Sequence, residues 1–155
     1  MIDMQKWQEI AKANIHNRPA TTGRLAGKIA IVTGSAQGFG KGIAEEMYKE
    51  GASIVIADLI EELAASVAAE MGERAVCVKV NVSDEESVAS LLQQTVEHFG
   101  GLDIFVSNAG VVRSGALDQL EKKDFDFVTS INYTAYFLCA KYAAAIMKAE
   151  HEADP

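Results

Sequence analysis

A glycine-rich segment at residues 33–40 combines backbone freedom with a position at the start of a helix. The segment is Thr33-Gly34-Ser35-Ala36-Gln37-Gly38-Phe39-Gly40, and it joins a short apolar run at 29–33 to a stretch of helical periodicity. Glycines let a ligand approach the backbone closely, and the free N–H groups and dipole at a helix N-terminus attract an anion such as a pyrophosphate. The alternative, a glycine-rich turn without a ligand, stays open on the glycines alone.

An acidic residue stands just after the second apolar run. Asp58 lies 20 residues beyond Gly38, where a carboxylate can accept hydrogen bonds from both ribose hydroxyls of an adenosine. Its charge would repel a 2′-phosphate, and neither 35–37 nor 59–60 contains a Lys or Arg to bind one. These features favour NAD over NADP. The alternative is that Asp58 is a solvated strand-end residue or a helix N-cap.

A third polar group, Asn108-Ala109-Gly110, follows the fourth apolar run. In a doubly wound parallel sheet, the segments that follow the strands meet at the edge where such folds bind their ligands. On its own, an Asn-Ala-Gly sequence is an ordinary turn. Its position after the fourth apolar run places it at the ligand-binding edge of the predicted sheet.

The hydrophobic pattern predicts the elements that position these groups. Beyond residue 27, short runs rich in Val and Ile alternate with longer segments of helical period, which is typical of parallel β-α-β units. We predict strands at 29–33, 53–57, 75–80 and 102–106, helices around 43–47, 63–71 and 88–99, and a long fourth helix from 124 to about 148. Ser83, with Glu86 three residues later, predicts a capping box for the third helix.

The segment before this pattern has a different character. Met4, Trp7, Ile10 and Ala11 have helical spacing, and Pro19 and Gly23 follow. We therefore divide the chain into an N-terminal helical appendage and linker at 1–27 and a nucleotide-binding domain at 28–155.

Composition excludes several classes of partner. The net charge is −8 over 155 residues, with no block of Lys or Arg, so neither nucleic acid nor a membrane surface is an expected partner. The sequence shows no metal-ligand spacing, and Cys77 and Cys139 lie in apolar stretches as small core residues. No apolar run reaches membrane-spanning length. These features predict a soluble, cytoplasmic protein.

The three groups together resemble the short-chain dehydrogenase/reductase family, which has a Thr-Gly-x-x-x-Gly-x-Gly turn and a later Asn-Ala-Gly. The resemblance covers roughly residues 25–150 and implies a Rossmann-type doubly wound parallel α/β sheet that binds NAD. It implies cofactor contacts from Thr33, Gly34, Ser35, Gln37, Gly38, Phe39, Gly40, Asp58, Leu59, Asn81, Val82, Asn108, Ala109 and Gly110. Asn81-Val82 departs from the family's Asp-Val, although the amide oxygen of Asn81 can still accept a hydrogen bond from the adenine amino group.

The resemblance also implies the proton-transfer groups. Asn132 matches an Asn in the fourth helix whose backbone carbonyl holds a water of the proton relay; the alternative is an Asn that caps a kink or faces solvent. The family's catalytic Ser lies on a fifth strand, and its Tyr-x-x-x-Lys lies on a fifth helix. This sequence has no Tyr followed four residues later by Lys. We therefore expect a chain truncated after the fourth helix and inactive by itself.

The leading hypothesis is an NAD-dependent short-chain oxidoreductase that acts on a small-molecule alcohol or ketone, such as a sugar or polyol. The alternatives are an NAD-binding module without turnover and, with less support, an S-adenosylmethionine-binding domain. An open edge on the fourth strand and an uncovered stripe on the long helix would favour pairing with another chain. The family often associates through this helix, so the resemblance implies a homo-oligomer.

Overall fold

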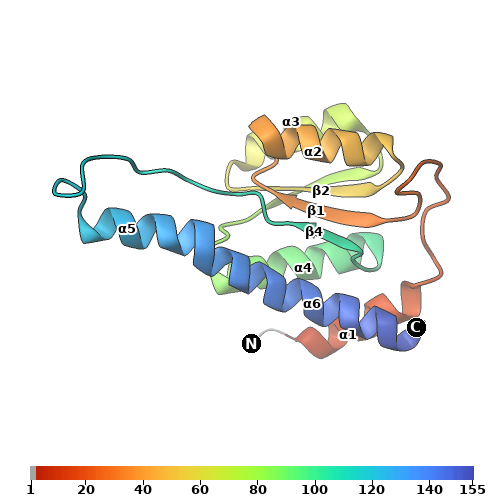
Figure 1. Cartoon of the computed structure of the whole chain (residues 1–155). Coiled ribbons are helices and arrows are strands. Elements are labelled where there is room, and N and C mark those ends of the chain that lie inside the picture. The colour runs from red at the N-terminus through yellow and green to blue at the C-terminus, as the bar shows by residue number, and fades with distance from the viewer. Residues whose placement is uncertain (1–2) are drawn as a thin grey trace.

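A four-stranded parallel sheet forms the centre of the computed structural model, which describes residues 3–155 (Figure 1). The strands are β1 (Ile29–Thr33), β2 (Ser53–Asp58), β3 (Ala75–Lys79) and β4 (Ile104–Val106), in the order β3-β2-β1-β4. The helices are α1 (Met4–Asn14), α2 (Gly38–Lys49), α3 (Glu61–Met71), α4 (Glu85–Phe99), α5 (Lys122–Thr129) and α6 (Ala135–Ala153), with a π-helix η1 (Ser130–Thr134) between the last two. The predicted doubly wound parallel fold is confirmed.

Helices cover both faces of the sheet, α2 and α3 on one side and α4 and α6 on the other (Figure 1). Successive residues of a strand point to opposite faces, so each strand supplies both layers. Ile31 and Val55 pack with α4 and α6, whereas Val32 and Ile54 pack with α2 and α3. The continuous apolar runs in the sequence therefore correspond to strands buried on both faces.

The fourth strand is shorter than predicted. It begins at Ile104, because the backbone N–H of Leu102 is directed to the carboxylate of Glu150 and not into a strand ladder. The next residue, Asp103, already bonds to the neighbouring strand, because its N–H donates to the carbonyl of Ile29 in β1 at 3.0 Å.

The predicted capping box at Ser83 is wrong. Asp84 is the N-cap of α4, and its carboxylate accepts a hydrogen bond from the N–H of Ser87 at 2.7 Å. The hydroxyl of Ser83 instead donates to Oδ1 of Asn81 at 2.8 Å. A carboxylate interacts more favourably than a hydroxyl with the positive end of a helix, so Asp84 and not Ser83 is the N-cap.

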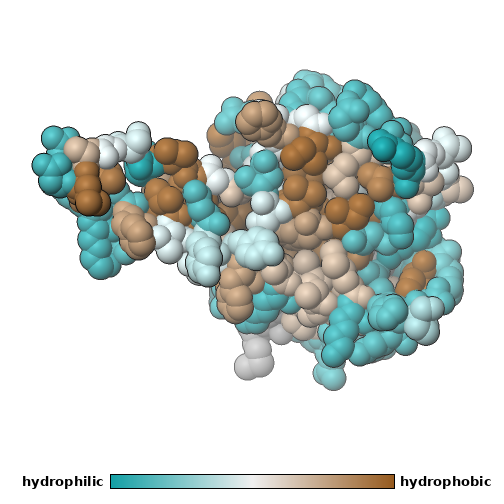
Figure 2. Space-filling model, viewed as in Figure 1, coloured by the Kyte–Doolittle hydropathy of each residue, from teal (hydrophilic) through white to brown (hydrophobic). Residues whose placement is uncertain are grey.

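The long helix predicted from 124 to about 148 is present, but the structure divides it into α5, η1 and α6. The helical stretch runs from Lys122 to Ala153 but contains the π-helical turn η1, whose backbone hydrogen bonds join residues five apart instead of four. The apolar residues of α5 therefore do not continue the stripe that α6 buries, and no residue of α5 is buried. Figure 1 shows α5 and the loop before it extending beyond the sheet, and Figure 2 shows apolar atoms on the surface of this arm.

The predicted N-terminal helix is present as α1, which packs against α4 and α6. Met1 and Ile2 of the predicted appendage lie outside the described residues, and the division of the chain at residue 27 stays a prediction. Cys139 lies on the buried face of α6, where burial raises the pKa of its thiol to about 11. Within 3–155 there is no helix that combines the length and apolarity needed to cross a bilayer.

Candidate active site

The turn between β1 and α2 and the first turn of α2 each contain a position at which only glycine fits. Gly34 has φ +66°, and a Cβ there would lie 2.9 Å from the Cα of Ala109. A Cβ on Gly40 would overlap the carbonyl oxygen of Gly34 and lie 2.5 Å from Nδ2 of Asn108. The N-cap of α2, Gln37, makes no side-chain hydrogen bond to the helix. The first-turn N–H groups of α2 therefore have no side-chain cap from Gln37, and Gly34 and Gly40 place no side chain beside them.

A hydrogen-bonded clasp joins this turn to the segment after β4. Oγ1 of Thr33 accepts from the N–H groups of Asn108 and Ala109, at 3.0 and 3.1 Å. In return, Nδ2 of Asn108 donates to the carbonyls of Thr33 and Gly34, at 2.9 and 3.2 Å. The two sequence motifs are therefore in direct contact, as the strand order requires for neighbours β1 and β4.

Asp58 ends β2 at the same edge of the sheet. Its Oδ2 accepts from the N–H of Ala36 at 3.0 Å, and its Oδ1 accepts from the N–H of Ile60 at 3.1 Å. These two bonds fix the carboxylate but use only part of its capacity as an acceptor. The N-cap of α3 is Ile60, so the alternative of Asp58 as a helix N-cap does not hold.

A cleft of about 300 Å³ brings these groups together. It is lined by Gly34, Gln37, Asp58, Leu59, Ile60, Val80, Asn81, Val82, Asn108, Ala109, Gly110, Val111 and Ile131. Most of the residues predicted for the cofactor are in this lining. Sequence reasoning missed Ile60, Val80, Val111 and Ile131; each lies next to a predicted residue or at the end of a predicted strand, and only the apolar pattern signalled them.

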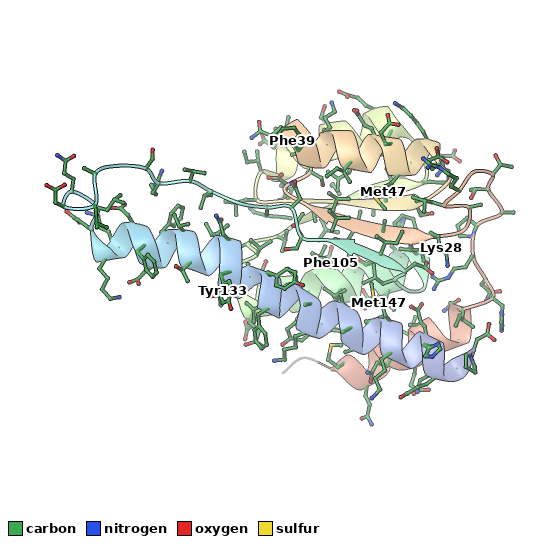
Figure 3. All side chains as sticks on the ribbon, viewed as in Figure 1. Lys28, Phe39, Met47, Phe105, Tyr133 and Met147 are labelled. Atoms are coloured by element: carbon green, nitrogen blue, oxygen red, sulfur yellow. The ribbon has the colours of Figure 1, made fainter. Side chains whose placement is uncertain are left out.

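Five predicted residues lie outside the lining. Thr33 and Ser35 are fully buried, and the hydroxyl of Ser35 donates to the carbonyl of Val32 and accepts from the N–H of Ala57. Gly38 begins α2, and Gly40 lies in its first turn. Phe39 is 91% exposed, and Figure 3 shows it at the surface at the start of α2. The hydroxyl of Ser35 is therefore engaged in holding β1 to β2.

Asn81 lies at the far end of the cleft with its amide oxygen already engaged. Oδ1 accepts from both the N–H and the hydroxyl of Ser83, at 3.2 and 2.8 Å. Because these two bonds fill the lone pairs of the oxygen, a ligand amino group would have to displace Ser83 to reach it. The predicted contact of Asn81 with adenine would therefore require breaking a hydrogen bond to Ser83, which the sequence alone did not show.

Asn132 lies in η1 and binds the loop after β4. Its Oδ1 accepts from the N–H of Val111, and its Nδ2 donates to the carbonyl of Val111, both at 2.8 Å. This paired contact places the π-helical turn beside Gly110 and Val111 of the cleft. The predicted relay role concerns the backbone carbonyl of Asn132 and stays a prediction.

Lys141 and Tyr142 are the nearest equivalent of a Tyr and Lys pair, but neither lines the cleft. Both donate to Glu85 at 2.8 Å. The hydrogen bond from Lys141, and then that from Tyr142, lowers the pKa of Glu85, while burial and the Glu85 carboxylate raise the pKa of Tyr142. The group ties α6 to the start of α4. Across residues 3–155 no cluster of His, Cys, Asp and Glu is suited to a metal ion.

Comparison with known proteins identifies the family. The sequence model described as "short chain dehydrogenase" matches residues 28–154. The chain belongs to the short-chain dehydrogenase family. It is 39% identical over 128 residues to "Tropinone reductase-like 1" of Erythroxylum coca and 40% identical over 128 residues to "Secoisolariciresinol dehydrogenase" of Forsythia intermedia. Each match covers 80% of this chain, and 47% and 46% of those proteins respectively.

A solved structure supports the same short-chain dehydrogenase fold. The 3-ketoacyl-(acyl-carrier-protein) reductase from Brucella melitensis, complexed with NADH, superposes with a TM-score of 0.78 at 33% identity. The match covers 80% of this chain and 52% of that chain. The chain thus spans about half the length of the short-chain dehydrogenases that it matches. Family membership favours the oxidoreductase hypothesis over the S-adenosylmethionine alternative.

Proposed function

We propose that the cleft binds NAD(H), and that the chain is the cofactor-binding part of an NAD-dependent oxidoreductase. The observation that carries the proposal is Asp58, a fixed carboxylate in a cleft whose lining contains no Lys or Arg. A carboxylate accepts hydrogen bonds from a free 2′-hydroxyl and repels a 2′-phosphate, and no lining cation offsets that repulsion. The NADH in the Brucella melitensis reductase is consistent with this choice.

The residues around the cleft suit the parts of this cofactor. The N–H groups of the first turn of α2 would hold the pyrophosphate, while Gly34 and Gly40 keep side chains away from it. Asp58 would hold the adenosine ribose, with Leu59 and Val82 beside the adenine. Asn108, Ala109 and Gly110 would line the nicotinamide end, since they follow β4 at the same sheet edge. When bound, the nicotinamide supplies or accepts the hydride.

We propose that the whole protein transfers hydride between this cofactor and a small-molecule alcohol or ketone. The relatives' names, a reductase and a dehydrogenase, support that reaction class. Self-association is a further part of the proposal, because β4 lies at one edge of the sheet formed by residues 3–155, and an edge strand can pair with another chain. We expect the 155-residue chain by itself to bind NADH without oxidising it when a ketone is added, which is checked by the absorbance of NADH.

Titration calorimetry with NADH and NADPH tests the cofactor choice. The native chain should bind NADH at least about tenfold more tightly than NADPH. Substitution Asp58→Ser should weaken NADH binding by roughly 10- to 100-fold, because a hydrogen bond to a charged group contributes about 1.5–3 kcal/mol. The same change should bring the two affinities closer together.

Glu61→Ser is the matched control, because Glu61 begins α3 three residues after Asp58 but does not line the cleft. It removes the same charge from the same region and should change NADH affinity less than about threefold. An equal loss in both variants, or tighter binding of NADPH to the native chain, would contradict the proposal.

A further inference from the structure

The end of the cleft next to β3 is where the nucleobase of a bound dinucleotide would lie. The glycine turn follows β1 and Asp58 ends β2, so a pyrophosphate and then a ribose placed there extend across the strand order toward β3. Val80, Asn81 and Val82 follow β3 and line the cleft at this end. Asn81 is the only one of the three with a polar side chain. Among the residues after β3, recognition of the polar edge of a base by a side chain therefore falls to Asn81.

The orientation of the Asn81 amide group is fixed by its neighbours. The N–H of Ser83 donates to Oδ1 at 3.2 Å in an Asx turn, and the hydroxyl of Ser83 donates to the same atom at 2.8 Å. The backbone of Asn81 is held as well, since its N–H donates to Oγ of Ser87 at 2.9 Å and its carbonyl accepts from the N–H of Asp84 at 3.0 Å. A backbone N–H can only donate, so it selects the oxygen of the amide and not the nitrogen. The oxygen therefore faces Ser83, and Nδ2 lies on the other side of the amide group.

The group that Asn81 leaves available to a ligand is a hydrogen-bond donor. Within residues 3–155, Nδ2 of Asn81 has no hydrogen-bond partner, whereas Oδ1 has two. Asn81 is exposed and lines the cleft, so Nδ2 is open to a bound base. Adenine has an amino group at C6, which is a donor, whereas an oxopurine such as hypoxanthine has a carbonyl oxygen there, which is an acceptor. The free donor of Asn81 complements the carbonyl and not the amino group.

We propose that the base end of the cleft does not select adenine, and that Ser83 sets this selectivity by occupying Oδ1 of Asn81. The proposal rests on the proposed function, the binding of a nicotinamide dinucleotide. A dinucleotide with a carbonyl at C6 of its purine binds about as tightly as NADH or more tightly, because that oxygen accepts from Nδ2. The apolar side chains of Leu59 and Val82 suit a purine of either kind. Ser83 does not itself line the cleft, so it acts on the base through Asn81.

Titration calorimetry of the 155-residue chain with NADH and with reduced nicotinamide hypoxanthine dinucleotide tests this selectivity. The readout is the ratio of the two affinities in one protein, because a change in folding or in net charge affects both ligands alike. In the native chain the hypoxanthine analogue should bind within about threefold of NADH, or more tightly. If NADH binds more tightly than the analogue by a larger factor, the proposal fails while the proposed function stands. If neither dinucleotide binds, both fail.

Substitution Ser83→Ala should create a selection for adenine. Only the backbone N–H of residue 83 then donates to Oδ1 of Asn81, which leaves one lone pair of the oxygen for the amino group of adenine. The affinity ratio should shift toward NADH by roughly three- to tenfold, which is the contribution of one ordinary hydrogen bond. An unchanged ratio in this variant would overturn the proposal, because Ser83 would then have no influence on the base.

Two further variants give the test an upper limit and a control. Asn81→Asp replaces the free donor by a second acceptor oxygen, so the ratio should shift toward NADH by at least about tenfold. Ser90→Ala is the matched control for Ser83→Ala, because Ser90 is an exposed serine of α4 that does not line the cleft. Its ratio should stay within about twofold of the native ratio. A shift in Ser90→Ala as large as that in Ser83→Ala, or no shift in Asn81→Asp, would also contradict the proposal.

Discussion

β1 and β4 lie side by side in the sheet and end at the same cleft, but they are built differently. All five residues of β1 are fully buried, between β2 and β4 and between two layers of helices. The three residues of β4 are only half-buried, at the edge of the sheet. After β1 the chain turns at once through a tightly packed glycine turn, whereas after β4 it runs out along the arm that ends in α5 (Figure 1).

This difference separates the two ends of the cleft. The glycine turn, Thr33 and Asp58 are held by partly buried hydrogen bonds, so the surface proposed for the pyrophosphate and ribose is formed before any ligand binds. Such preorganisation lowers the entropic cost of binding. After Gly110, the loop residues 112–121 are exposed, and the hydrogen bonds of Asn132 to Val111 join the start of this loop to η1. Changes near β1 should therefore have larger effects than changes near β4.

The largest effect should come from Gly40→Ala. Its Cβ would overlap the carbonyl of Gly34 and press on Asn108, so both the turn and the clasp must move. We expect NADH affinity to fall at least about 100-fold, and the free energy of unfolding to fall by about 1–3 kcal/mol. Gly42→Ala is the control, because its Cβ meets nothing within 4 Å. It should keep NADH affinity and stabilise the helix by about 0.5–1 kcal/mol. Calorimetry and urea unfolding measure both.

Removing the hydroxyl of Thr33 should have the next largest effect. Thr33→Val leaves the N–H of Ala109 without its acceptor and the N–H of Asn108 with only the carbonyl of Val106, at 3.1 Å. Because an unsatisfied group in the protein costs about 1–3 kcal/mol, we expect a loss of roughly 2 kcal/mol in urea unfolding. Thr95 is equally buried, but its hydroxyl only donates to the carbonyl of Leu91 within α4. Thr95→Val should therefore cost less than about 1 kcal/mol. Similar losses in the two variants would show that the clasp adds nothing beyond an ordinary buried hydroxyl.

The β1 side of the site could be predicted because local rules determine it. A glycine turn at a strand end and an acid at the end of the next strand follow from backbone conformation and from the parallel order of strands. Asn81 shows where such rules stop, because its neighbour Ser83 occupies the amide oxygen that the ligand was expected to meet. Motif spacing places a residue at the cleft, but competition among nearby side chains decides which of its atoms are free.

The β4 side could be predicted only in outline. The strand and the long helix are present, but the π-helical turn is not visible in the apolar spacing, since it accompanies the contact of Asn132 with Val111, 21 residues away in sequence. The start of β4 likewise depends on Glu150, 48 residues from Leu102. Contacts over such separations follow from tertiary packing, which hydrophobic periodicity alone does not encode.

The contact between η1 and the loop after β4 offers a smaller test. Asn132→Ala removes both hydrogen bonds to Val111 at an exposed site, where water replaces them, so we expect a loss of about 1 kcal/mol. NADH affinity should fall only a few-fold, because Gly110 and Val111 line the cleft without being clasped to β1. Ser130→Ala, which removes one local bond to Phe127 in the same turn, should cost less than about 0.5 kcal/mol. A 100-fold loss of NADH affinity in Asn132→Ala would mean that the β4 side of the cleft, like the β1 side, is formed before NADH binds.

The smallest effect is a pH dependence at the start of β4. Burial raises the pKa of Glu150 above its ordinary value of 4.5, against the lowering effect of Arg18. The folded chain therefore binds more protons at this group than the unfolded chain does, and its contribution to stability is present below pH 4.5 and declines as pH rises through the raised pKa. Glu150→Gln cannot titrate and should remove this decline. The test is the difference in urea unfolding free energy between native chain and variant from pH 4.5 upward. This difference should shift in favour of the variant as pH rises, with a slope of at most about one proton. A difference independent of pH would mean that folding does not raise the pKa of Glu150.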